Sequence, residues 1–175
     1  FKDRRAGKLS GGMKQKLALS CALIHRPTVL FLDEPTTGVD AVSRKEFWEM
    51  LRTLKQQGIT ILVSTPYMDE ANLCDRVALM QNGSILSINT PKGIVDSFQK
   101  PLYAIKSGTM LHLLNELKQT AYVEDAYPFG EFHHVVLKNE DAKHLLEQFS
   151  LQQNASLKPV HPDIEDCFIS LMKTA

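Results

Sequence analysis

The hydrophobic pattern of the first hundred residues predicts a strand-helix-strand unit. Two short apolar runs rich in β-forming residues, 28–33 and 59–65, have the length and composition of buried strands in a parallel sheet. Between them, residues 41–57 carry apolar side chains at helical spacing, and Gly58 is placed to end that helix. We therefore expect two parallel strands joined by a crossover helix.

Further helices and a hairpin are predicted on both sides of this unit. A helix is expected at 12–25, because Ser10 can cap the exposed amides of its first turn and Pro27 follows its end. Before residue 100 we also expect a short helix at 68–73 and a hairpin formed by strands 76–80 and 84–88. A second short helix is expected from residue 91 onward.

The pattern changes near residue 100, where strands and helices follow in a different order. The expected elements are strand 102–106, helix 109–119, strands 121–127 and 132–138, helix 140–149, strand 156–160 and helix 163–173. This βαββαβ order with one added helix is the ferredoxin-like arrangement. We predict two domains, 1–100 and 101–175, in which an α/β segment with a parallel sheet precedes a small α+β domain.

Composition and charge narrow the class of protein. The 175 residues are 43% hydrophobic and 23% charged, which is typical of a globular chain. Twenty basic residues balance twenty acidic ones, so we expect no nucleic-acid partner. The apolar runs are much shorter than the roughly 20 residues that cross a bilayer, and three scattered cysteines suit a reducing compartment.

A possible phosphate-binding loop lies at Ser10, Gly11 and Gly12. Two glycines let backbone amides approach a ligand closely, and the helix that follows directs its positive end toward the same place. An ordinary capped helix start is the alternative, and we favour it for this short motif taken alone.

Two carboxylates, Asp33 and Glu34, follow the first predicted strand. In open parallel sheets ligands bind at the carboxyl ends of the strands. One carboxylate can hold a magnesium ion through its water shell, and the other can orient or deprotonate an attacking water. A solvated strand end is the alternative, and it is less favoured when the pair comes after a phosphate loop.

Together these motifs resemble the rear half of an ATP-binding-cassette (ABC) ATPase. Leu9 to Met13, followed by Gln15, is similar to the signature loop of that family. Val29 to Asp33, followed by Glu34, is similar to its Walker B strand, and Thr37 to Asp40 to its D-loop. The resemblance implies part of a P-loop NTPase fold that uses ATP and Mg²⁺.

The family resemblance also implies roles for these residues. In that family two cassettes face head to tail, and the signature loop of one closes over the nucleotide held by the other. The implied nucleotide-binding residues are Ser10, Gly11, Gly12, Gln15 and Asp40. The implied catalytic residues are Glu34, which would position the hydrolytic water, and Asp33, which would assist the metal through water.

Two departures from the family pattern affect these expectations. The Walker A sequence is absent from the chain, so we expect the chain to begin inside a longer protein and to bind ATP only weakly alone. Pro66 stands where the family's switch histidine would be, in a segment from Ser64 to Ala71 that resembles the switch region. Proline offers neither a side-chain donor nor a backbone amide to a phosphate.

Further similarity points to bacterial exporters of the drug, antibiotic or lipid type. Pro159 to Phe168 fits the end of the accessory domain found in such proteins. The resemblance implies a membrane-spanning permease partner and a place on the cytoplasmic face of the membrane. Two alternatives stay open, a regulatory or weakly hydrolytic cassette half and a soluble cassette that acts on DNA or ribosomes.

Overall fold

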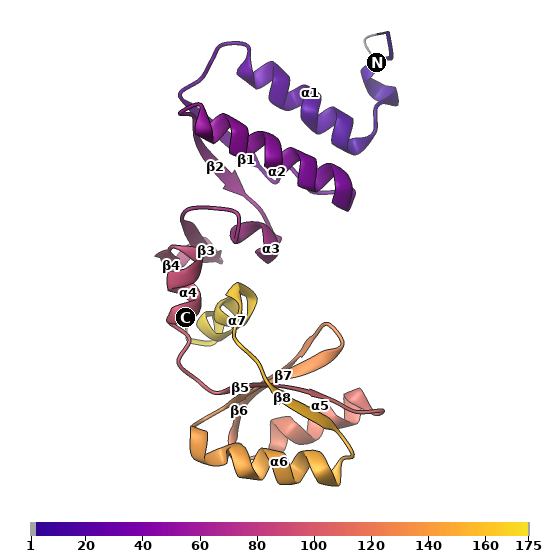
Figure 1. Ribbon diagram of the computed structural model, residues 1–175, viewed down its shortest axis with the longest axis vertical. Helices are drawn as coiled ribbons and strands as arrows, with labels where there is room; N and C mark the ends of the chain where they lie inside the picture. Colours follow the sequence, from indigo (N-terminus) through magenta and orange to yellow (C-terminus); the bar gives the residue numbers. More distant parts are fainter. Residues whose placement is uncertain (1–2, 175) are drawn as a thin grey trace. The chain divides into compact units, whose positions relative to one another are not determined.

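The computed structural model describes residues 3–174, which form two compact units that meet between Asp75 and Arg76. Figure 1 shows the elements of both units along the chain. The domain boundary predicted at residue 100 lies inside the second unit and stays a prediction about independently folding domains. Within residues 3–174, every helix is too short or too polar to cross a membrane.

The first unit is built on the predicted strand-helix-strand motif. Strands β1 and β2 pair in parallel from Val29↔Thr60 to Asp33↔Ser64. Its elements are η1 (Ala6–Lys8), α1 (Gly11–Leu23), β1 (Val29–Asp33), α2 (Ala41–Gln56), β2 (Thr60–Ser64) and α3 (Met68–Ala71). The predicted motif is thus confirmed, with strand and helix ends within two residues of their expected positions.

Polar caps fix where the two long helices of the first unit begin. The Ser10 hydroxyl accepts a hydrogen bond from the Met13 amide at 3.3 Å, as the sequence predicts. Asp40 does the same for α2, because its Oδ1 accepts from the Ser43 amide at 2.9 Å. Ser10 and Asp40 therefore each have a local structural role as the cap of a helix.

The apolar side chains of the first unit gather on one face of the two strands. Leu19, Leu30, Phe47 and Leu51 are its buried core and come from α1, β1 and α2. On the opposite face Phe31 is 72% exposed and Leu62 is 61% exposed. The prediction that both strands are buried is therefore wrong for this face, because the core formed by α1 and α2 lies on the other face only.

The second unit begins with the predicted hairpin. Strands β3 (Val77–Gln81) and β4 (Ser84–Asn89) pair antiparallel. Asn82 and Gly83 have φ values of 50° and 78°, the left-handed conformation that a tight two-residue hairpin turn requires. Helix α4 (Pro91–Asp96) follows, capped by the Thr90 hydroxyl, which accepts from the Gly93 amide at 3.0 Å.

A four-stranded antiparallel sheet forms the rest of the second unit. Its strand order is β6-β7-β5-β8, which is the order that the βαββαβ pattern predicts. Its elements are β5 (Leu102–Lys106), α5 (Met110–Gln119), β6 (Val123–Phe129), β7 (Phe132–Leu137), η2 (Glu140–Ala142), α6 (Lys143–Gln152), β8 (Ser156–Pro159) and α7 (Ile164–Thr174).

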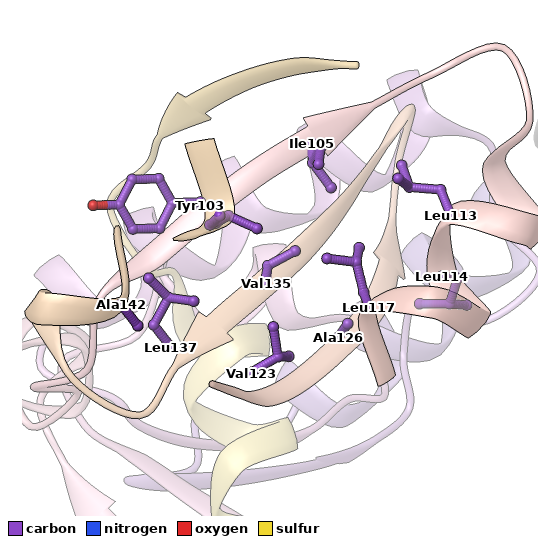
Figure 2. Close-up of a cluster of buried hydrophobic side chains, with 11 residues drawn as sticks. Tyr103, Ile105, Leu113, Leu114, Leu117, Val123, Ala126, Val135, Leu137 and Ala142 are labelled. Carbon is purple, nitrogen blue, oxygen red and sulfur yellow. The ribbon is translucent and has the colours of Figure 1, made fainter. Parts of the chain in front are cut away.

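Both faces of this sheet carry apolar side chains, because residues along each strand alternate between them. Figure 2 shows the larger cluster, in which Ile105 and Val135 from the sheet face Leu113 and Leu117 from α5. On the other face Leu102, Tyr127 and Val136 pack with α7 residues such as Ile169. The added helix α7 therefore covers the face opposite α5 and α6.

Candidate functional site

The carboxylate pair lies at the carboxyl end of β1, as predicted, and a serine of β2 joins its two members. Ser64 Oγ donates to Asp33 Oδ1 at 2.5 Å and accepts from the Glu34 amide at 3.0 Å. The Glu34 amide also donates to the Ser64 carbonyl at 3.1 Å. These bonds follow from the strand register, because Asp33 and Ser64 are partners.

Glu34 has an unusual backbone conformation for a residue other than glycine. Its φ of 43° lies in the left-handed region, which is unfavourable for a residue other than glycine and recurs at active sites. The Thr37 hydroxyl donates to Glu34 Oε2 at 3.1 Å, so the side chain is oriented as well as the backbone. The Glu34 carboxylate nevertheless stays exposed to solvent.

The start of α1 packs closely against the start of α2. A Cβ atom added at Gly12 would lie 2.6 Å from both Cβ and Oγ of Ser43, and one at Gly11 would lie 3.2 Å from the Gly38 carbonyl oxygen. Both glycines are therefore explained by close packing, which brings the signature residues beside the segment that ends at Asp40.

Replacing Gly12 with alanine is expected to lower the free energy of unfolding by about 1–3 kcal/mol, because the new methyl group would overlap Ser43. Gly7→Ala is the matched control, since a Cβ there meets nothing within 4 Å. Denaturant unfolding of the two variants measures the difference. Equal midpoints would show that α1 and α2 can separate without cost.

Asp40 is held in its charged form by the helix start that it caps. Hydrogen bonds from the Ser43 amide and then the Ser43 side chain lower the pKa of the Asp40 carboxyl below its usual value. The charge also favours the positive amino end of α2. Asp40 therefore joins the D-loop-like segment rigidly to the helix that follows it.

The remaining predicted residues occupy separate positions. Gln15 is half-buried within α1, and Pro66 is exposed between β2 and α3. Among residues 3–174, no hydrogen bond or ion pair joins Ser10, Gly11 or Gly12 to the carboxylate pair. The structure thus yields two separate groups, one at the start of α1 and one at the end of β1.

A network beside the carboxylate pair was not predicted from the sequence. Glu70 is 1% exposed and accepts hydrogen bonds from Thr36, Thr65 and Arg44. A cavity of about 320 Å³ opens next to it between α2 and α3, and Arg44 and Glu70 are among its lining residues. Within the described chain, no cluster of three or more His, Cys, Asp or Glu side chains could hold a metal ion.

The motifs at the start of the chain match a known protein family, and the whole chain has similar relatives. The family model described as "ABC transporter" matches residues 1–37. The chain is 38% identical, over 98% of its length and 30% of the relative's, to the probable multidrug ABC transporter ATP-binding protein YbhF of Escherichia coli strain K12. It is 34% identical, over 97% of its length and 55% of the relative's, to the Nod factor export ATP-binding protein I of Rhizobium sp. strain N33.

The chain is similar to ATP-binding proteins of ABC transporters. The similarity to these two proteins extends through both compact units, because each alignment covers nearly the whole chain. A solved structure, the ATP-binding cassette MJ1267 of an ABC transporter, is similar over 50% of this chain and 35% of that chain, with 31% identity and a TM-score of 0.47. The chain spans only part of the two relatives, 30% and 55% of their respective lengths.

Proposed function

We propose that the chain is part of an ATP-hydrolysing subunit that drives export through a membrane-spanning partner. The observation that carries this proposal is the carboxylate pair at the end of β1, in which Ser64 contacts both Asp33 and Glu34. Such a pair suits magnesium-assisted attack of water on a phosphate. The two relatives are an ATP-binding protein of a probable multidrug transporter and one of Nod factor export.

ATP and Mg²⁺ fit the chemistry of these residues. Asp33 is exposed and has one carboxylate oxygen fixed by Ser64, so it is suited to a hydrated magnesium ion. When bound, the metal would neutralise charge on the phosphates. Glu34 would orient and deprotonate the attacking water, and its left-handed backbone together with Thr37 would hold it in place for that purpose.

The start of α1 would serve a second cassette. Ser10, Gly11 and Gly12 present backbone amides at the amino end of a 13-residue helix, which favours a bound phosphate. We assign to this group the closure over nucleotide held by a facing cassette, with Gln15 and Asp40 beside it. The exposed apolar face at Phe31 and Leu62 favours burial against further polypeptide.

Two measurements on the intact protein test this proposal. Purification from membranes is expected to yield a multi-span membrane protein together with the chain, and steady-state phosphate release is expected to show ATP hydrolysis. Recovery with nucleic acid or ribosomes, without a membrane protein, would favour the soluble alternative instead. A protein that binds ATP without releasing phosphate would favour the regulatory alternative.

Pro66 keeps the weakly hydrolytic alternative open, and replacing it provides a test. Pro66→His in the intact protein is expected to raise ATP turnover about tenfold or more, because an imidazole can donate to a phosphate. Pro66→Ala is the matched control, since it removes the proline without adding a donor, and it is expected to stay within about twofold of wild type. Equal phosphate-release rates for Pro66→His and Pro66→Ala would show that the imidazole has no role.

A further inference from the structure

We infer that Glu70 is a positioning residue that links the loop after β1 to the segment around Pro66, so that the two move together. The inference rests on the proposed function, because both segments belong to the proposed ATP site. Glu70 lies in α3 and is 1% exposed, and it contacts neither of the predicted catalytic carboxylates directly. Its contribution to hydrolysis would therefore act through the residues that it holds.

The first link joins Glu70 to the loop between Glu34 and Asp40. The Thr36 hydroxyl lies 2.8 Å from Glu70 Oε1 and 3.0 Å from Oε2, and Thr36 is itself only 1% exposed. Thr36 in turn accepts from the Val39 amide at 3.2 Å through its carbonyl oxygen. A buried charge-assisted hydrogen bond thus fixes the centre of this loop.

The second link joins Glu70 to the residues on either side of Pro66. The Thr65 hydroxyl donates to Glu70 Oε2 at 2.6 Å and accepts from the Tyr67 amide at 3.1 Å. The turn that contains the exposed Pro66 is therefore joined to Glu70 through Thr65. The same hydroxyl cannot keep both bonds unless this turn is maintained.

Arg44 completes the network from α2. Its Nε donates to Glu70 Oε1 at 3.1 Å, one of its Nη atoms donates to Asp69 at 3.1 Å, and its guanidinium stacks 4.2 Å from the centre of the Tyr67 ring. A buried carboxylate needs such partners, and removing one donor leaves part of its hydrogen-bonding capacity unsatisfied away from water. Loss of the hydrogen bond at Thr36 should therefore also weaken the hydrogen bonds of Thr65 on the other side of Glu70.

The test compares Thr36→Val with Thr36→Ser in the intact protein. Valine keeps the volume but removes the hydroxyl that donates to Glu70, whereas serine keeps it. Hydrogen exchange at the Tyr67 amide is read out, because this amide bonds to Thr65 on the far side of Glu70. Thr36→Val is expected to accelerate that exchange about tenfold and Thr36→Ser to leave it near the wild-type rate, while the Leu62 amide in β2 reports whether the whole unit has been destabilised.

Kinetics supply the second readout. Thr36→Val is expected to lower kcat about tenfold with KM for ATP within about twofold of wild type, and Thr36→Ser to restore kcat. Equal Tyr67 exchange in both variants would contradict the link through Glu70. Equal kcat values in an active protein would contradict its role in positioning, whereas a wild-type protein that releases no phosphate would contradict the proposed function itself.

Discussion

Glu34→Gln is expected to lower the ATPase rate of the intact protein by about 10²–10⁴-fold, because glutamine cannot take a proton from the attacking water. Glutamine has the same shape, and its amide can still interact with the Thr37 hydroxyl that now donates to Glu34 Oε2. Nucleotide affinity should therefore change little. Steady-state phosphate release measures the rate, and equilibrium titration with a fluorescent nucleotide measures the affinity.

A surface carboxylate in the same unit provides the control for this change. Glu46 lies on α2 and forms an exposed ion pair with Lys16, so Glu46→Gln is expected to leave the rate within about twofold of wild type. Residual activity of Glu34→Gln above about one tenth of wild type would contradict its assignment as the general base. Equal loss in both variants would point to a general effect of removing negative charge from this unit.

Local patterns in the sequence predict much of this fold, because interactions between residues close in the sequence determine where these elements begin and turn. Ser10 and Asp40 start helices through side-chain caps, and Asn82-Gly83 determines a tight hairpin turn. Side chains alternate between the two faces of a strand, so the neighbours His133 and His134 of β7 lie on opposite faces of the sheet. His133 contacts the Met110 carbonyl oxygen in α5, whereas His134 contacts Asp166 in α7.

The features that the sequence did not predict all depend on contacts between distant segments. Ser64 joins the carboxylate pair only because strand register places it beside Asp33, which a predicted parallel pairing could have indicated. Glu70 accepts hydrogen bonds from nearby Thr65 but also from Thr36 and Arg44, which lie 34 and 26 residues away, and no local pattern marks it. The exposure of Phe31 could not be predicted, because a short apolar run is compatible with a strand that is covered on one face or on both.

A buried carboxylate holds α7 against the sheet of the second unit. Asp166 is 1% exposed, and its Oδ1 lies 2.7 Å from both Tyr127 Oη and His134 Nδ1. Asp163 and Asp166 also cap one another, since each side chain accepts from the other's amide, at 2.9 and 3.0 Å. Burial opposes the charge of Asp166, but the hydrogen bonds from His134, the Asp163 amide and Tyr127 outweigh it and lower the pKa of Asp166 below 3.8.

Asp166→Ala is therefore expected to lower the free energy of unfolding by about 3–5 kcal/mol, because it leaves the buried Tyr127 and His134 side chains and the partly buried Asp163 amide without their acceptor. Glu165→Ala, its exposed neighbour on the same helix, is expected to lower it by less than about 1 kcal/mol. The stabilisation from a carboxyl with a lowered folded-state pKa is present above its unfolded pKa and is lost as the pH falls through the folded one. In denaturant titrations, the difference in the free energy of unfolding between wild type and Asp166→Ala should accordingly be large at pH 7 and shrink below pH 3.8. A difference that did not depend on pH would mean that lost packing at α7, rather than the charge of Asp166, holds this helix to the sheet.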